Sequence, residues 1–226
     1  MKNQLPTVLT INGGFLDVAG FLALQGLFTG HITGNIVTLS AGLATGATGS
    51  IAKMLALPVY CVAVAFFSTL VHPLSRRSRP IHRRALLAIE MLLVSAGSLV
   101  IIAHGTFQDG DSWQAILGGM LLVSGMAVQN TVQRIHLTTI PPTTVMTGTI
   151  TQLMIDFVHV MATPRSQLTE SVVARVKLFT GLLIAFVVGA VIAAVLFLYV
   201  GVWCFIGSIA LCILGLWLGH RLPEQA

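Results

Sequence analysis

The sequence predicts an all-α integral membrane protein, and two observations lead to that class. Of the 226 residues, 55% are hydrophobic and only 8% are charged, whereas about 25% of the residues in a typical soluble domain are charged. Apolar runs recur along the whole chain, with short breaks between them. Helices are expected, because the strands of a membrane barrel would need short segments of alternating hydrophobicity. The breaks leave no room for a separate soluble domain, so residues 1–226 are predicted to form a single membrane domain.

Eight apolar segments can be marked, and three of them are short for a membrane span. They cover residues 15–28, 33–46, 54–71, 85–104, 113–132, 145–161, 176–198 and 201–219. Because a helix rises about 1.5 Å per residue, the first two reach only about 21 Å of a hydrocarbon core about 30 Å thick. The segment 145–161 is marginal. We therefore predict that the short segments belong to broken or re-entrant helix units. Residues that loosen or stop a helix lie around them: Gly30, Gly34, Pro141, Pro142 and Gly148.

The distribution of basic residues decides how many segments cross the membrane. Five of the twelve Lys and Arg residues fall in "HPLSRRSRPIHRRA", which is typical of a cytoplasmic loop between two spans rather than of a nucleic-acid patch. If all eight segments crossed, six basic residues would lie on each side. If 15–28 with 33–46, and 113–132 with 145–161, each make one net crossing, eleven lie inside and only Lys53 lies outside. We therefore predict six net crossings, with both termini in the cytoplasm.

The two halves, 1–112 and 113–226, are predicted to share one plan in opposite orientations, since each half crosses an odd number of times. Each would begin with a broken unit and continue with two full spans. The stretches "ITGNIVTLSAGLAT" and "MTGTITQLMIDFVH" align without a gap at an offset of 114 residues. Polar or small residues then recur at steps of three, four and three, on one helical face of each copy. These residues are Asn35, Thr38, Gly42 and Thr45 in the first copy, and Thr149, Gln152, Asp156 and His159 in the second.

The two breaks are predicted to line a polar pathway. Irregular backbone at membrane depth is tolerated where it is buried in protein or lines a watery cavity. Thr33 is well placed to cap the helix after the first break, and the N–H groups of such a helix start suit an anion or a polar solute. Secondary transporters place their sites where two inverted repeats bring broken helices together. The alternative is that the polar side chains only cap helices or tie them together.

Three carboxylates lie in or near apolar segments. Asp17 has no basic neighbour on its own helix, and a charge at membrane depth costs about 2.5–3.5 kcal/mol on insertion scales, so such residues are usually functional. It is predicted either to couple a proton or to accept hydrogen bonds from Gln129 or Asn130. Asp156 has the same two interpretations, with His159 as a partner or relay. Glu90 is expected to be structural, snorkelling or pairing with Arg83.

Two further patterns leave alternatives open. Gln129, Asn130 and Gln133 lie at one end of an apolar segment, where they could face the pathway or satisfy backbone groups freed by the second break. Small residues also recur at every fourth position along 176–198, which permits close helix packing either within the chain or in a homodimer. This small-residue ladder consists of Gly181, Ala185, Gly189 and Ala193.

The stretch "GGFLDVAGFLALQGLFTGHITGN" resembles the signature of the YoaK-like family of small multi-pass bacterial inner-membrane proteins. That signature has a Gly-Phe-x-Asp opening followed by Phe, His and Thr-Gly-Asn, and Ile32 stands where methionine is expected. The resemblance continues through "SGMAVQNTVQR" and "TTVMTGTITQL". It implies the membrane class and a bacterial origin, but no reaction, because the family has no established substrate. The positions that carry it are Asp17, His31, Thr33, Gly34, Asn35, Gln129, Asn130, Thr147, Gly148 and Thr149.

The predicted function is a small secondary transporter or channel that moves a small polar or anionic solute across the bacterial inner membrane. Proton linkage through Asp17 or Asp156 is an open option. The alternative is a non-transporting scaffold or assembly protein. An enzyme is not expected, because the sequence has no His-Glu-x-x-His helix and no Gly-x-Ser-x-Gly elbow. No cofactor, metal or nucleic acid is predicted. The predicted pathway residues are Asp17, His31, Thr33, Gly34, Asn35, Thr38, Gln129, Asn130, Thr147, Gly148, Thr149, Gln152, Asp156 and His159.

Overall fold

The computed structural model describes residues 4–46, 49–74, 79–138, 140–144, 147–164 and 169–222. Within these ranges the chain forms eight α-helices and one 3-10 turn, and no strand. The all-α class is therefore confirmed. The predicted basic loop around residues 75–78 and the stretch around Arg165 lie outside the described residues. The elements are α1 (Gln4–Ala23), α2 (Ile32–Thr45), α3 (Ser50–Leu74), α4 (Arg79–His104), α5 (Trp113–His136), α6 (Thr147–Ala162), α7 (Glu170–Val200), η2 (Gly201–Cys204) and α8 (Phe205–Arg221).

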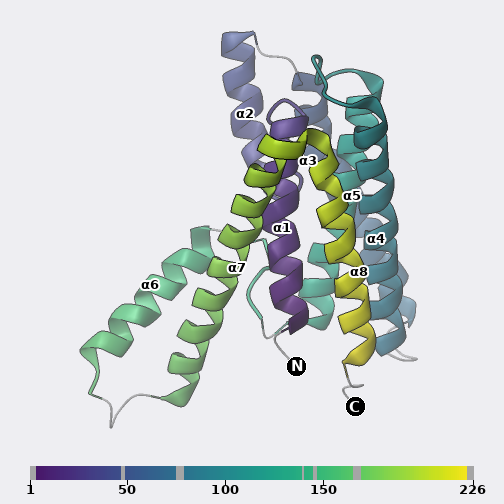
Figure 1. Cartoon of the computed structure of the whole chain (residues 1–226). Helices are drawn as coiled ribbons and strands as arrows, with labels where there is room; N and C mark the ends of the chain where they lie inside the picture. Colours follow the sequence, from purple (N-terminus) through teal and green to yellow (C-terminus); the bar gives the residue numbers. More distant parts are fainter. Residues whose placement is uncertain are drawn as a thin grey trace.

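Five stretches of the described residues are long and apolar enough to cross a membrane. The last of them, Glu170–Arg221, contains 52 residues and comprises α7, η2 and α8. The chain reverses direction at η2 (Figure 1), where Gly201 adopts a φ of +57° that favours glycine. The apolar helices are compatible with a multi-pass membrane protein. The first four stretches are Gln4–Ala23, Ser50–Leu70, Arg83–His104 and Trp113–His136.

The first helix is longer than the sequence predicts. The apolar segment was expected to start at residue 15, because Asn12, Gly13 and Gly14 interrupt the apolar run, but α1 begins at Gln4 and has 20 residues. The three residues stay helical because each meets the bundle. A β-carbon on Gly14 would lie 2.2 Å from the Phe186 carbonyl oxygen of α7, so only glycine allows this approach, and Asn12 is completely buried. This helix alone is therefore long enough to span.

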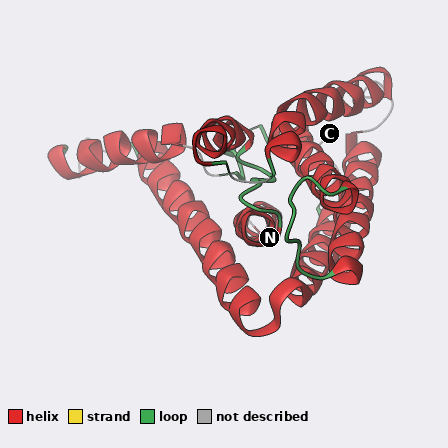
Figure 2. Ribbon diagram, turned by 90° about the horizontal axis from the view of Figure 1, so that it is seen from above, coloured by secondary structure: helices red, strands yellow, loops and turns green. Residues whose placement is uncertain are grey.

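The helices pack around α1 and α5, which are the most deeply buried of the candidate spans. α1 packs against α7 and α8, and α5 packs against α3 and α4, while α4 also contacts α8. Figure 2 looks down the bundle and shows the start of the chain in the middle of the other helices. The two short helices lie at the periphery: α2 packs on α3, and α6 packs on α7 and diverges from the bundle (Figure 1).

The small-residue ladder of α7 is buried over most of its length, and at Gly189 it touches α1. Ala185, Gly189 and Ala193 are buried, and a β-carbon on Gly189 would lie 2.0 Å from the carbonyl oxygen of Ile11 in α1. Gly181 is exposed and has open space around it. Packing within the chain thus accounts for three of the four ladder residues.

Asp111 ties the α4–α5 connection to the start of α3. Its carboxylate accepts backbone N–H groups from four successive residues of that helix start, at 2.8–3.3 Å: Gly49, Ser50, Ile51 and Ala52. A helix N-terminus leaves such N–H groups without intrahelical partners, and a carboxylate suits both their hydrogen bonds and the helix dipole. The carboxylate therefore acts as the cap of α3 from a distant part of the chain.

We expect Asp111→Ala to lower the free energy of unfolding by about 1–2 kcal/mol, the range for loss of a helix cap. The measurement is unfolding of the purified protein in detergent, followed by tryptophan fluorescence. Glu170→Ala is the control, because Glu170 is an exposed acid in the first turn of α7. Equal stability of the two variants would contradict the capping role.

At the opposite end of the bundle, two arginines of α4 bind the end of α8. Arg83 donates to the carbonyl of Gly219 at 3.0 Å, and Arg84 donates to that of His220 at 2.9 Å. The predicted pairing of Arg83 with Glu90 is therefore wrong. The carbonyls at a helix C-terminus attract the guanidinium instead.

Candidate functional site

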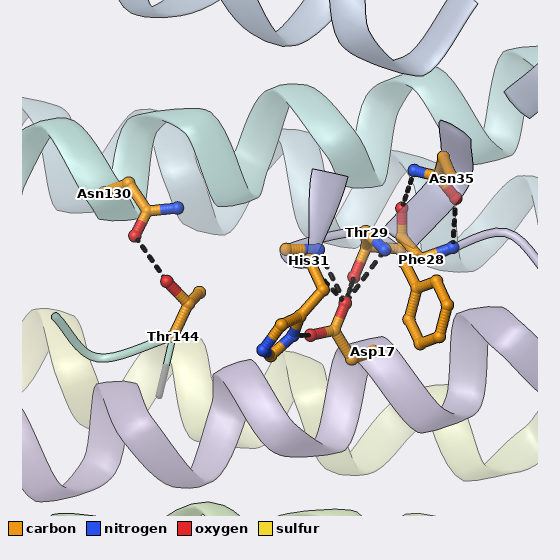
Figure 3. Close-up of polar contacts among 8 residues, drawn as sticks. Asp17, Phe28, Thr29, His31, Asn35, Asn130 and Thr144 are labelled. Carbon is orange, nitrogen blue, oxygen red and sulfur yellow. Dashed lines mark hydrogen bonds and ion pairs between the residues drawn. The ribbon is translucent and has the colours of Figure 1, made fainter. Parts of the chain in front are cut away.

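Asp17 holds the break between α1 and α2. Its Oδ1 accepts the backbone N–H groups of Thr29, Gly30 and His31, at 3.0, 2.6 and 3.3 Å (Figure 3). Its Oδ2 lies 2.5 Å from Nδ1 of His31. Successive backbone N–H groups in a turn form a concavity that binds anions, and here the anion is the carboxylate of Asp17 itself. The expectation that Asp17 accepts from Gln129 or Asn130 is therefore wrong, since the loop supplies its donors.

Asn35 fixes the same loop from the side of α2. Its Nδ2 donates to the carbonyl of Phe28, and its Oδ1 accepts the N–H of Phe28, both at 2.8 Å (Figure 3). The predicted cap at Thr33 is wrong, because α2 begins with no side-chain cap and Thr33 is exposed. The amide of Asn35 bridges back to the loop instead. Around it, Gly34 lies against the ring of Phe28, and the Thr38 hydroxyl donates to the carbonyl of Asn35 at 3.3 Å.

The polar end of α5 holds the second break in a similar way. Gln129 donates to the hydroxyl of Thr143 at 3.1 Å, and Gln133 donates to the carbonyl of Ile140 at 2.7 Å. The Thr144 hydroxyl donates to Oδ1 of Asn130 at 3.2 Å (Figure 3). The contact of Gln133 satisfies a backbone group of the break, as one of the two interpretations expects, whereas Gln129 and Asn130 bind threonine side chains of the break.

The two breaks meet between α1 and α5. A β-carbon on Gly30 would lie 3.1 Å from Cγ2 of Thr144 and 3.3 Å from Oδ2 of Asp17, so the first loop touches the second at this glycine. Nδ2 of Asn130 is buried, and it faces the side on which His31 and Asp17 lie (Figure 3). The side chain of His31 is 32% exposed. We call this cluster the loop junction; it consists of Asp17, Gly30, His31, Asn130 and Thr144.

The predicted pathway residues of α6 lie apart from the loop junction. Thr147, Gly148 and His159 are exposed, and Asp156 is buried against α7. Both oxygens of Asp156 accept from Arg175, at 2.5 and 2.6 Å, and Gln152 donates to it at 2.9 Å. Asp156 is therefore hydrogen-bonded to Arg175 and Gln152 rather than to His159, which acts on it only electrostatically. α6 lies outside the five candidate spans, and the Arg175 guanidinium lowers the pKa of the Asp156 carboxyl below its ordinary value.

A cleft of about 860 Å³ lies between α5, α6 and α7. Three predicted pathway residues line it, and so do two arginines from α5 and α7; these five are Gly148, Thr149, Gln152, Arg134 and Arg175. Another cleft, of about 650 Å³ between the ends of α1 and α8, includes none of the predicted pathway residues. Across the described ranges, no three His, Cys, Asp or Glu side chains come together as a metal site would require.

The Asp156–Arg175 pair is expected to hold α6 against α7. In an Arg175→Gln variant, we expect a cysteine placed at the buried Leu153 of α6 to react faster with a thiol reagent than in the parent. Cys61 is exposed and would be replaced by serine in both proteins. The charge reversal Asp156→Arg with Arg175→Asp should restore slow labelling. Fast labelling in the parent itself would show that α6 is not held.

The family model described as "Protein of unknown function (DUF1275)" matches residues 5–218. The chain belongs to the DUF1275 family. That membership is consistent with the YoaK-like resemblance of the sequence. Searches of curated proteins and of solved structures found no match.

The structure adds residues to the site that the sequence did not single out. Thr143 and Thr144 stand 114 residues after Thr29 and Gly30, so extending the internal alignment by three residues would have found them. Arg175 had no such signal, because it lies on the next helix, 19 residues from Asp156. In this DUF1275 member the internal alignment is thus more informative about the loops than about the short helices.

Proposed function

We propose that the chain is a small secondary transporter or channel that moves a small polar or anionic solute across the bacterial inner membrane. The observation that carries the proposal is the loop junction, where helix breaks from opposite halves of the chain touch at Gly30 and Thr144. Inverted-repeat transporters build their sites from such a pair of breaks. Buried polar side chains at this depth are costly unless they serve a pathway or a fixed bond.

Six net crossings in two inverted halves, 1–112 and 113–226, belong to the proposal. The crossings would be α1, α3, α4, α5, α7 and α8. The packing pairs support the repeat, because exchanging α1 to α4 for α5 to α8 in order maps three of the main pairs onto three others and the pair of α4 with α8 onto itself. The contact of α1 with α7 becomes that of α5 with α3, and α4 on α5 becomes α8 on α1. Similarly, α2 on α3 becomes α6 on α7.

The proposed orientation puts both termini in the cytoplasm. Both ends of the described chain lie at one end of the bundle (Figure 1), together with the arginines that bind the end of α8. Lys53 belongs to the other end, since α3 begins there beside Asp111. This arrangement agrees with the positive-inside rule.

The preference for an anion now rests on the cleft beside α6 rather than on the first helix start. The loop N–H groups near Asp17 already bind its carboxylate. The cleft instead offers Arg134 and the polar Thr149, together with the donors of Arg175 that Asp156 does not use. Arginine presents several N–H donors in a fixed geometry that matches oxyanions. A solute would enter at this cleft and pass to the loop junction when the halves tilt.

The test is entry of small probes into vesicles that contain the purified protein. Light scattering would follow formate, nitrate, inorganic phosphate and neutral glycerol. We expect at least one probe to enter faster than in protein-free vesicles, and entry to slow in Thr144→Val, which keeps its shape but loses the bond to Asn130. The matched control is Thr151→Val, on the exposed face of α6. Equal entry in both variants would place the pathway elsewhere.

The second candidate function is a non-transporting scaffold or assembly protein. The observation that favours it is that both oxygens of Asp17 are used by the loop and by His31, as expected if the polar residues only hold the helices together. Failure of all four probes to enter faster than in protein-free vesicles would reject transport of these solutes and favour the scaffold.

A further inference from the structure

Glu90, in the middle of the bundle, is a carboxyl without a cationic partner among the described residues. It is 1% exposed. Its Oε2 has no hydrogen-bond partner, and its Oε1 lies 4.0 Å from Sγ of Cys212. Arg83 and Arg84 of its own helix bind the end of α8 instead. An isolated carboxylate is very costly in such surroundings, whereas the neutral acid needs only one hydrogen-bond acceptor.

The groups that face Glu90 come from several helices, and none of them carries a formal charge. α8 contributes the thiol of Cys212, and α1 contributes the amide of Asn12. α5 contributes the amide of Gln129, one contact further away. In the described part of α3 and in η2, no basic side chain forms an ion pair with Glu90. The titratable groups of this cluster are thus Glu90 and the Cys212 thiol.

A chain of polar contacts leads from Glu90 to the second break. Nδ2 of Asn12 donates to Sγ of Cys212 at 3.4 Å and lies 3.5 Å from Oε1 of Gln129. Nε2 of Gln129 in turn donates to the hydroxyl of Thr143 at 3.1 Å, next to Thr144 of the loop junction. Oδ1 of Asn12 is itself buried without a donor. Asn12 also makes a side-chain hydrogen bond to Glu90. Because an amide carries both an N–H donor and an oxygen acceptor, Asn12 can serve a carboxylate with its N–H or, after its amide turns, an O–H group of Glu90 with its oxygen.

The two carboxylates that the sequence predicts as proton-coupling groups, Asp17 and Asp156, already have other strong partners. Asp17 accepts three backbone N–H groups and faces His31. Asp156 binds Arg175 through both oxygens. A proton on Asp156 would displace a donor of Arg175, and a proton on Asp17 would lie on its contact with His31. A proton on Glu90 would displace no cation, because no ion pair of Glu90 is present among the described residues.

We propose that Glu90 is a proton-binding site of this protein and that its protonation state is transmitted to the loop junction through Asn12, Gln129 and Thr143. A proton adds to one carboxylate oxygen, and the resulting O–H donates to Asn12. When the proton leaves for the aqueous phase, the carboxylate takes the amide N–H of Asn12 instead, which changes the contact of Asn12 with Gln129. The proton site stands on its own, whereas its coupling to solute movement rests on the proposed function.

The proton site is tested by infrared spectroscopy of the protein in vesicles of bacterial polar lipids at neutral pH. We expect the carbonyl stretch of a protonated carboxyl, and we expect it to vanish in Glu90→Gln and to persist in Glu170→Gln, the exposed control. If Glu90→Gln does not fold, Cys212→Ser gives a second readout, because a changed donor beside Oε1 should shift the band. A band that persists unchanged in these variants, or no such band in the parent, would overturn the proposal.

The coupling is tested with any probe that the parent protein transports in the vesicle assay. We expect accumulation driven by a pH gradient to disappear in Glu90→Gln, while exchange of the probe without a gradient continues. Gradient-driven accumulation equal to that of the parent would reject the coupling. If none of the four probes is transported, the coupling is rejected together with the proposed function, and the infrared band decides the proton site alone.

Discussion

The Asp17→Asn variant is expected to lose about 3 kcal/mol of unfolding free energy, the cost of removing one partner from a buried charged contact. The carboxylate accepts three loop N–H groups on one oxygen and faces His31 with the other. An asparagine side chain has one acceptor oxygen, and its NH₂ group can only donate. It therefore cannot satisfy both sets of contacts. The measurement is unfolding in detergent by increasing SDS, followed by tryptophan fluorescence.

Two further variants separate the contributions to this loss. Glu170→Gln is the control for removing one acidic group, and we expect it to unfold like the parent. His31→Gln leaves the three backbone N–H contacts of Asp17 intact, so we expect a smaller loss than for Asp17→Asn. If Asp17→Asn unfolds like Glu170→Gln, the carboxylate does not hold the loop. The Asp17 carboxylate would then be available to bind a solute or a proton.

The sequence predicts the helical class and the positions of the two breaks because these features depend on local composition. Apolar runs must be helical at membrane depth, and the glycines and prolines near residues 30 and 141 interrupt them. The same local reasoning fails for α1. In the sequence, Asn12, Gly13 and Gly14 interrupt an apolar run. In the structure, they lie where α1 contacts other parts of the bundle. A residue that breaks an isolated pattern can be the one that permits close packing.

Hydrogen-bond partners were harder to predict than positions. One of the two predicted roles of Asp17 was to accept from a side chain of α5, yet its donors are backbone N–H groups 12–14 residues away. Backbone donors carry no sequence signal, so the pattern of residue types could not indicate them. Glu90 was expected to be structural because arginines lie nearby in sequence. The carbonyls at the end of α8 compete for those arginines, and only the fold shows that competition.

Gly189→Ala is expected to destabilise the protein by about 3 kcal/mol, the upper part of the range for overpacking a well-filled interior. The added β-carbon would lie 2.0 Å from the Ile11 carbonyl oxygen and 2.8 Å from its carbonyl carbon. These atoms belong to the backbone of α1, so no side-chain rotation relieves the collision and the two helices must move apart. The midpoint of SDS unfolding measures the loss. Gly14→Ala, on the other side of the same contact, should behave similarly, because its β-carbon would lie 2.2 Å from the Phe186 carbonyl oxygen.

Gly181→Ala is the matched control, because Gly181 belongs to the same ladder but lies two ladder positions before Gly189. No atom lies within 4 Å of its added β-carbon, so we expect no loss of stability, and a gain of up to about 1 kcal/mol from helix propensity.

A homodimer through Gly181, Ala185, Gly189 and Ala193 stays a prediction, and cross-linking of the same variants in vesicles tests it. Because the three ladder residues nearest α1 are buried inside the chain, only the Gly181 end is available to a second copy. If Gly181→Ala abolishes the cross-linked dimer without changing stability, the Gly181 end of the ladder is the site of association. If Gly181→Ala and Gly189→Ala destabilise the protein equally, the contact of α1 with α7 is not the reason for the ladder.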